Sequence, residues 1–329
     1  MQTYIVLIAC VILLLCLFFR VPVYISVFAA ALTYFLFQTG SSPAIIAQRI
    51  GGGIQSIPLL AIPFFICAGI FMNSSGVTKR IMNFCNVVTK RMTGGLGQVN
   101  VLLSTLMGGL SGSNLADAAM EAKILVPEME EKGYSKEFSS VLTATSAMIT
   151  PLIPPGIGMI LYGSIANVSI GKLFVAGIGI GVLLCISLMI MVHFISKKRG
   201  YQPATKEKQD PEEVKSAVKQ AILPLCLPIL IIGGIRIGIV TPTEAGTVAI
   251  VYALILGIIY KELKMSDVVD GLKESVATTA SIMMIVGGAS AFAWVLTKER
   301  IPQQLTEVIT SSISNKYVFL IIVILFLLV

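Results

Sequence analysis

The chain has 329 residues, of which 56% are hydrophobic and 12% are charged, and its formal net charge is +7 at neutral pH. Soluble domains are about one quarter charged, so this much apolar surface excludes an ordinary water-soluble protein of this size. No two of the 6 cysteines have CxxC spacing, so neither a zinc site nor a disulfide framework is indicated. We expect an all-α integral membrane protein surrounded by the lipid bilayer, and not a nucleic-acid-binding protein.

Apolar runs follow one another along the chain, and several approach the roughly 20 residues that a membrane-spanning helix needs. They cover residues 4–19, 21–38, 57–73, 95–110, 138–163, 172–195, 220–239, 243–260, 274–296 and 317–329. The first run lacks a basic region before it and a small-residue cleavage site after it. We therefore interpret it as a retained span and not as a cleaved signal peptide.

Basic residues between the runs set the orientation. They gather at Lys79, Arg80, Lys90 and Arg91, at Lys197, Lys198 and Arg199, and at Lys206, Lys208, Lys215 and Lys219. The positive-inside rule places these clusters in the cytoplasm, and counting back through three spans puts the N-terminus in the periplasm. Residues 77–93 alternate polar and apolar positions, which predicts an amphipathic helix at the cytoplasmic interface. The segment 197–219 is predicted to be a soluble cytoplasmic loop.

The short run 95–110 leads into a polar segment that ends at Asp117, and the chain soon turns charged after it. The charged residues are Glu121, Lys123, Glu128, Glu130, Glu131 and Lys132. Both arms then begin and end on one side of the membrane, which predicts a re-entrant hairpin with a buried or water-lined tip. Oxygens of Ser111, Ser113 and Asn114 at this tip suit sodium. Alternatively, Asn114 and Asp117 only cap a helix, which is compatible with ion binding.

Prolines interrupt the run 138–163, and hydroxyl side chains accompany them. These residues are Pro151, Pro154, Pro155, Thr145, Ser146 and Thr150. Proline lacks an amide donor and breaks a helix, so the carbonyls before it lose their partners. A broken helix that faces a hairpin tip forms the midplane substrate and ion site of many transporters. The alternative is a proline kink that the Ser and Thr hydroxyls satisfy locally.

The second half of the chain repeats the first at an offset of 220 residues. Pro22 falls on Pro242, Arg80 falls on Arg300, and the order of spans, amphipathic stretch and short run is the same. Because 57–73 would run inward and 274–296 outward, we predict an inverted repeat, as in many secondary transporters. The counterpart of Ser111 would be position 331, so we expect that this sequence is incomplete.

Other residues have simpler interpretations. Pro242 and Glu244 are ordinary helix-start signals, and Arg236 at a span end is expected to snorkel towards the interface. The sequence from Gly109 to Gly112 has the Gly-x-Ser-Gly form of an intramembrane protease. However, the only histidine, His193, is expected at the cytoplasmic edge, far from a serine at the tip.

Three motifs together resemble the large membrane subunit of TRAP (tripartite ATP-independent periplasmic) transporters. They are Gly-Leu-Ser-Gly-Ser-Asn-Leu-Ala-Asp-Ala-Ala at 109–119, Thr-Pro-Leu-Ile-Pro-Pro-Gly at 150–156 and Pro-Thr-Glu-Ala-Gly at 242–246. The resemblance covers essentially the whole chain, although the family's subunits are longer and continue into a second hairpin and a second broken helix.

The resemblance implies an inverted-repeat, elevator-type transporter with a re-entrant hairpin and a broken helix. Such proteins import a carboxylate solute across the bacterial inner membrane, driven by sodium. A periplasmic binding protein delivers the solute, and a small four-helix membrane subunit packs against the large one. A sialic acid is favoured by general similarity, with a C4-dicarboxylate as the alternative.

The resemblance also assigns sites and segments. The expected sodium ligands are Ser111, Ser113, Asn114, Thr145, Thr150 and Pro151. The expected substrate residues are Ser111, Ser113, Asn114, Asp117, Pro154 and Gly156. The expected segments are scaffold 1–76, cytoplasmic arm 77–93, transport domain 94–171, span 172–196, loop 197–219, scaffold 220–297, periplasmic arm 298–314 and the start of a second hairpin at 315–329.

Two alternatives remain. One is a proton-coupled carrier or antiporter of similar fold, in which Asp117 would titrate. The other, from a different class, is a membrane scaffold or receptor that transports nothing. Two interrupted spans argue against it, because each interruption lowers stability and a protein without a binding site would gain nothing in return. Neither a ring of like charges nor a repeated filter motif points to a channel.

Overall fold

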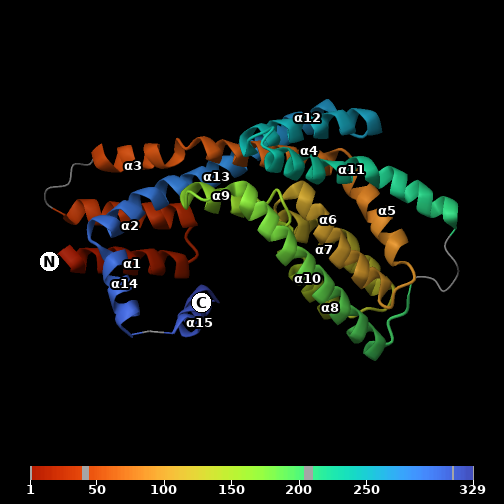
Figure 1. Ribbon diagram of the computed structural model, residues 1–329, viewed down its shortest axis with the longest axis horizontal. Helices are drawn as coiled ribbons and strands as arrows, with labels where there is room; N and C mark the ends of the chain where they lie inside the picture. The colour runs from red at the N-terminus through yellow and green to blue at the C-terminus, as the bar shows by residue number, and fades with distance from the viewer. Residues whose placement is uncertain (1, 39–43, 204–209, 313–314, 329) are drawn as a thin grey trace. The chain divides into compact units, whose positions relative to one another are not determined.

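The computed structural model describes residues 2–38, 44–203, 210–312 and 315–328, and every regular element within these ranges is a helix (Figure 1). In chain order they are α1 (Gln2–Phe18), α2 (Val23–Phe37), α3 (Ala44–Ile54), η1 (Ile57–Leu60), α4 (Ala61–Ser74), α5 (Val77–Thr89), α6 (Gly95–Ser111), α7 (Asn114–Glu131), α8 (Lys136–Ser146), η2 (Ala147–Leu152), α9 (Ile157–Ile165), α10 (Ile170–Arg199), α11 (Pro211–Ile237), α12 (Pro242–Tyr260), α13 (Met265–Lys298), α14 (Ile301–Ser312) and α15 (Lys316–Leu328). The described part of the chain therefore confirms an all-α fold.

Among the described residues, 5 helices are long and apolar enough to cross a membrane, and a sixth crossing is formed if the bent pair α8–η2 and α9 counts as one span. The five are η1 with α4, α10, α11, α12 and α13. The apolar side chains of α10 support this, because Leu183, Ile186 and Ile190 are each more than half exposed. Large apolar side chains at such positions face lipid in an integral membrane protein. The chain is therefore a membrane protein that crosses the bilayer several times.

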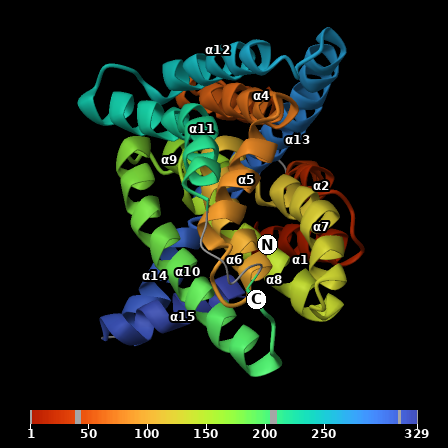
Figure 2. The ribbon, with the colours of Figure 1, turned by 90° about the vertical axis from the view of Figure 1, so that its right-hand side faces the viewer.

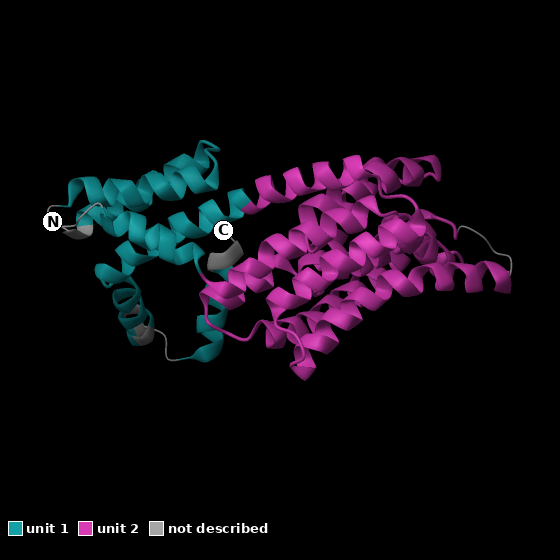
Figure 3. Cartoon of the chain, turned by 90° about the horizontal axis from the view of Figure 1, so that it is seen from above, with its two compact units in different colours: residues 1–55, 280–329 teal, residues 56–279 magenta. Residues whose placement is uncertain are grey.

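The chain divides into two compact units (Figure 3). Unit 1 comprises Met1–Gln55 and Ala280–Val329, and unit 2 comprises Ser56–Thr279. The boundary thus splits the predicted scaffold segment 1–76, because η1 and α4 pack in unit 2 against α12 and α9.

The predicted loop 197–219 is wrong at both ends. Helix α10 continues through its three basic residues to Arg199, where cations are favourable beside the exposed carbonyls of a helix end. Helix α11 begins at Pro211, after an Asp210 side chain that accepts a hydrogen bond from the Glu212 amide at 3.0 Å. The charged residues belong largely to the water-facing ends of two long helices.

Two further helices differ from the sequence prediction. Helix α3 was not expected, and α13 has 34 residues where an apolar run of 274–296 was predicted. The apolar pattern does not reveal the full length of α13, because its first residues are polar. The part of a helix that lies outside the membrane needs no apolar residues.

In unit 1, side chains join the end of α2 to the end of α13. Phe35 stacks on Trp294 with ring centroids 5.4 Å apart, and the Tyr34 hydroxyl donates a hydrogen bond to Glu299. Lys298 donates to the Gln38 side-chain oxygen at 3.2 Å. Hydrogen bonds between polar side chains thus add to the apolar contact between the ends of the two helices.

In unit 2, α6 occupies the centre and contacts α4, α5, α7, α8, η2, α10 and α11 (Figure 2). Glycines permit these contacts. A Cβ atom on Gly69 of α4 would lie 2.8 Å from the Ser111 carbonyl oxygen of α6. At the separate contact between α12 and α4, a Cβ atom on Gly246 would lie 2.8 Å from Phe64 Cβ. Arg80 joins the start of α5 to the end of α12, since it pairs with Glu262 at 2.9 Å and lies over the Tyr260 ring.

The order of helices follows the predicted offset of 220 residues. Helices α2, α5 and α6 have α12, α14 and α15 as counterparts, each beginning within about four residues of the expected position. The counterparts of α3 and α4 are fused in the single helix α13. The repeat is therefore visible in the element order.

The glycine contacts of α6 can be tested with Gly108→Ala. A Cβ atom there would lie 2.8 Å from the Thr150 carbonyl oxygen and 2.9 Å from its Cα, both of which are backbone atoms. We expect a loss of about 1–3 kcal/mol from overpacking, seen as a lower melting temperature of the purified protein in detergent. Gly179→Ala on α10 is the control, because nothing lies within 4 Å of its Cβ position. Equal melting temperatures for the two variants would contradict the close contact.

Candidate functional site

The tip between α6 and α7 turns within three residues. Helix α6 ends at Ser111, and Gly112 adopts a left-handed conformation with φ of 63°. The Ser113 hydroxyl then caps α7 by accepting a hydrogen bond from the Ala116 amide at 3.4 Å. Glycine is required at the turn, because a Cβ atom there would be strained and would lie 2.5 Å from the Pro155 carbonyl oxygen.

The broken helix lies directly against this tip. The axis bends by 46° between α8–η2 and α9, around the segment from Ile153 to Gly156. A Cβ atom on Gly109 would lie 3.4 Å from the Pro154 carbonyl oxygen, and one on Gly108 would lie 2.8 Å from the Thr150 carbonyl oxygen. The turn between α6 and α7 therefore lies against the proline-containing bend between η2 and α9.

Asp117 is the charged group of the tip. Its side chain is 0% exposed and accepts a hydrogen bond from the Ser111 hydroxyl at 2.5 Å. Its second oxygen, Oδ1, is buried without a partner among the described residues. A buried carboxylate with a free oxygen is stabilised by a proton, a cation or a hydrogen-bond donor such as water.

Glu121 repeats this arrangement one turn further along α7. It is 0% exposed, accepts a hydrogen bond from Ser104 at 2.6 Å, and has a buried Oε1 atom without a described partner. The sequence analysis placed Glu121 in the charged end of the hairpin, which is wrong. The available signal was its spacing, since Asp117, Glu121 and Leu125 recur every four residues and form the buried face of α7.

A second polar cluster lies between α6 and the α8–η2 segment, and the sequence analysis named only its Ser146 and Thr150. Asn100 donates to the Thr143 hydroxyl at 2.7 Å and accepts from the Ser146 hydroxyl at 2.6 Å. The Thr150 hydroxyl reaches the Ser104 carbonyl oxygen at 3.3 Å. Hydrogen bonds thus fix the broken helix to α6 along much of its length, which favours a unique arrangement.

The structure does not bring all of the predicted site residues together. Ser111, Asp117, Thr150, Pro154 and Gly156 are buried around the tip. A second group lies at its margin, where Ser113 and Pro151 are half-buried and Asn114 is exposed. Thr145 is also half-buried, but its hydroxyl donates to the Val141 carbonyl oxygen of its own helix at 2.8 Å.

The oxygens that surround the tip come from carboxylates, hydroxyls and backbone carbonyls. Such ligands suit hard cations, whereas softer transition metals prefer imidazole or thiolate. Within the described ranges, no group of three or more His, Cys, Asp or Glu residues is arranged for a metal ion. His193, the residue that a serine protease would need, is exposed near the end of α10 and contacts the neighbouring Phe194 ring.

Comparison with known proteins identifies the family. The model of the family "Tripartite ATP-independent periplasmic transporter, DctM component" matches residues 10–329. The chain belongs to this family. The sialic acid TRAP transporter large permease SiaM of Vibrio cholerae is 41% identical over 95% of this chain and 73% of its own length. The sialic acid TRAP transporter permease SiaT of Haemophilus influenzae is 39% identical over 92% of this chain and 49% of its own.

A third relative, the 2,3-diketo-L-gulonate TRAP transporter large permease YiaN of Escherichia coli, is 36% identical over 87% of this chain and 67% of its own. The chain is thus a TRAP transporter permease and not an enzyme, as the motif resemblance implied. It spans about three quarters of the length of SiaM and about half of that of SiaT.

The buried bond between Ser104 and Glu121 can be tested by breaking it from one side. Ser104→Ala leaves the Glu121 carboxyl without its only described partner, which costs about 1–3 kcal/mol. Adding Glu121→Leu removes the orphaned group, so the double variant should regain most of the lost melting temperature. Ser187→Ala is the control, because Ser187 is exposed on α10 and bonds only to its own helix. A double variant that is less stable than Ser104→Ala would contradict the assignment.

Proposed function

We propose that this TRAP permease is the membrane subunit of a sodium-driven secondary transporter that imports a carboxylate solute. The observation that carries the proposal is the free buried oxygen of Asp117 at the meeting point of two interrupted helices. Sodium bound beside Asp117, the Ser111 hydroxyl and nearby carbonyls would neutralise the carboxylate and hold the tip against the broken helix. The helix N-terminus of α7 would then attract the solute's carboxylate.

The substrate we propose is a sialic acid. The two relatives named for sialic acid are 41% and 39% identical to this chain, against 36% for the diketogulonate permease and 34% for a C4-dicarboxylate permease of Pseudomonas aeruginosa. The order of identities favours sialic acid, and the C4-dicarboxylate remains the alternative.

We further propose that the protein works as part of a three-component system in the bacterial inner membrane. The family's description as tripartite supports a small four-helix membrane subunit and a periplasmic binding protein as partners. The transport domain, residues 94–171, would move as an elevator while the arm helices near 77–93 and 298–314 stay with the small subunit. The N-terminus would lie in the periplasm, because the basic ends of α5 and α10 then face the cytoplasm.

Sodium coupling can be tested in proteoliposomes that contain the full complex and the binding protein. Uptake of labelled sialic acid should require an inward sodium gradient. Ser111→Ala removes a hydroxyl from the proposed site, so the half-saturating sodium concentration should rise about tenfold, while Ser187→Ala should leave it unchanged.

Uptake that ignores sodium and follows a proton gradient would instead establish the alternative of a proton-coupled carrier. In that case Asp117→Asn should abolish the response to pH, since the amide cannot exchange a proton. Under sodium coupling, Asp117→Asn should weaken sodium dependence without creating a dependence on the proton gradient.

A further inference from the structure

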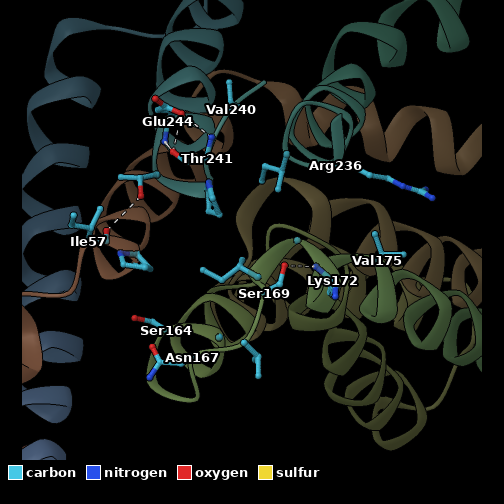
Figure 4. Close-up of a pocket in the computed structure, with 18 residues that line it drawn as sticks. Ile57, Ser164, Asn167, Ser169, Lys172, Val175, Arg236, Val240, Thr241 and Glu244 are labelled. Atoms are coloured by element: carbon cyan, nitrogen blue, oxygen red, sulfur yellow. Dashed lines mark hydrogen bonds between the residues drawn. The ribbon is translucent and has the colours of Figure 1, made fainter. Parts of the chain in front are cut away.

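A cavity of about 1300 Å³ lies at one end of unit 2, apart from the hairpin tip (Figure 4). Its walls come from the loop after α9, the starts of α10 and α12, the end of α11, and η1. The nine-residue helix α9, about 14 Å long, separates these walls from the proline break at the tip. This end of unit 2 is opposite to the basic ends of α5 and α10, so the proposed orientation places the cavity on the periplasmic side.

Two exposed basic residues in the cavity wall have no acidic partner among the described residues. Lys172 and Arg236 line it, and neither makes an ion pair with a described residue. The one carboxylate in the wall, Glu244, is committed to its own helix, because it accepts from the Thr241 amide at 2.7 Å and from the Thr241 hydroxyl at 2.8 Å. Figure 4 shows Glu244 against Thr241, with Arg236 extending away from them.

Lys172 stands where a helix disfavours a cation. It lies in the first turn of the 30-residue helix α10, which has no acidic residue in that turn. Unpaired amides make a helix N-terminus positive, so a lysine there repels the helix dipole. The Ser169 hydroxyl satisfies only the Lys172 amide, at 3.4 Å. An anion in the cavity would relieve this repulsion and interact with the lysine and with the helix end.

The other walls suit a polar organic molecule better than a bare inorganic ion. Ser164, Asn167 and Thr243 supply hydroxyl and amide groups, and Ile57 and Val175 supply apolar surface. One part of the cavity wall is also joined by a hydrogen bond, since the Thr243 hydroxyl donates to the Ile57 carbonyl oxygen at 3.5 Å and so links α12 to η1.

We propose that this cavity is an entry site that binds the carboxylate of an organic acid before the acid reaches the hairpin tip. Lys172 and Arg236 recognise the carboxylate, and the polar wall accepts hydroxyl groups. The inference rests on the proposed function, because it takes the transported solute to be an organic acid. An anionic lipid headgroup has the same charge chemistry, so the experiment has to distinguish the two sources.

The uptake test uses Lys172→Gln, Arg236→Gln and the double variant in proteoliposomes of the full complex. The double variant should raise the KM for sialic acid about tenfold and leave both the maximal rate and the half-saturating sodium concentration unchanged. Lys219→Gln is the control, because Lys219 is exposed on the same helix as Arg236 but outside the cavity. An unchanged KM would overturn the entry site, whereas a wild-type complex without sodium-dependent uptake would overturn the proposed function instead.

A binding test without the periplasmic protein gives a second readout. Sialic acid and succinate should raise the melting temperature of the purified membrane complex, and the uncharged sugar N-acetylmannosamine should not. The double variant should lose this response, and Ser111→Ala should keep part of it. If the double variant impaired uptake but kept the full response, the two cations would serve to dock the binding protein and the proposal would fail.

The lipid alternative is tested by comparing vesicles of phosphatidylcholine alone with vesicles that also contain phosphatidylglycerol. The entry site predicts the same rise in KM in both. A rise that occurs only with phosphatidylglycerol would show that the cavity holds a lipid headgroup, which would overturn the proposal.

Discussion

The constraint on which the rest of the structure depends is that backbone polar groups within a membrane must find partners inside the protein. Two helices of unit 2 are interrupted, so their freed carbonyls and amides have to be buried against each other. Gly108, Gly109 and Gly112 make this possible, because no side chain separates the tip from the carbonyls of residues 150–155. The site therefore exists because the two breaks cover one another.

This arrangement accounts for the buried acids. Asp117 and Glu121 lie on the one face of α7 that is turned towards α6, and each finds a serine hydroxyl there. Hydroxyls satisfy one oxygen of each carboxyl and leave the other free. A fully paired cluster would only stabilise the hairpin, whereas a free oxygen leaves a place for an ion or a proton to bind and leave again.

The sequence predicted the breaks well because they depend on local chemistry. Gly112 takes up the left-handed backbone of the tip, and three closely spaced prolines in the next run, Pro151, Pro154 and Pro155, remove backbone amide donors. It did not predict the burial of Glu121, because a carboxylate followed by Lys123 and Glu128 looks like the water-facing end of a helix. The direction of the Thr145 hydroxyl was equally hidden, since it depends on which face of α8 meets α6. The packing of neighbouring helices determines both the burial of Glu121 and the direction of the Thr145 hydroxyl, and this packing cannot be predicted from a local sequence pattern.

The two polar regions of unit 2 have opposite charge, which would give the proposed transport cycle an order of ligand binding. Lys172 and Arg236 at the cavity attract an anion and repel sodium, whereas Asp117 attracts sodium and repels a carboxylate as long as it is bare. A carboxylate could therefore bind at the cavity, but its binding would not become more favourable on moving to a tip without sodium. In the proposed mechanism, sodium would neutralise Asp117, which would remove the repulsion and leave the amides at the start of α7 to attract the anion. Separating the charges by the length of α9 would thus make solute entry depend on sodium binding, without requiring any contact between the two ligands.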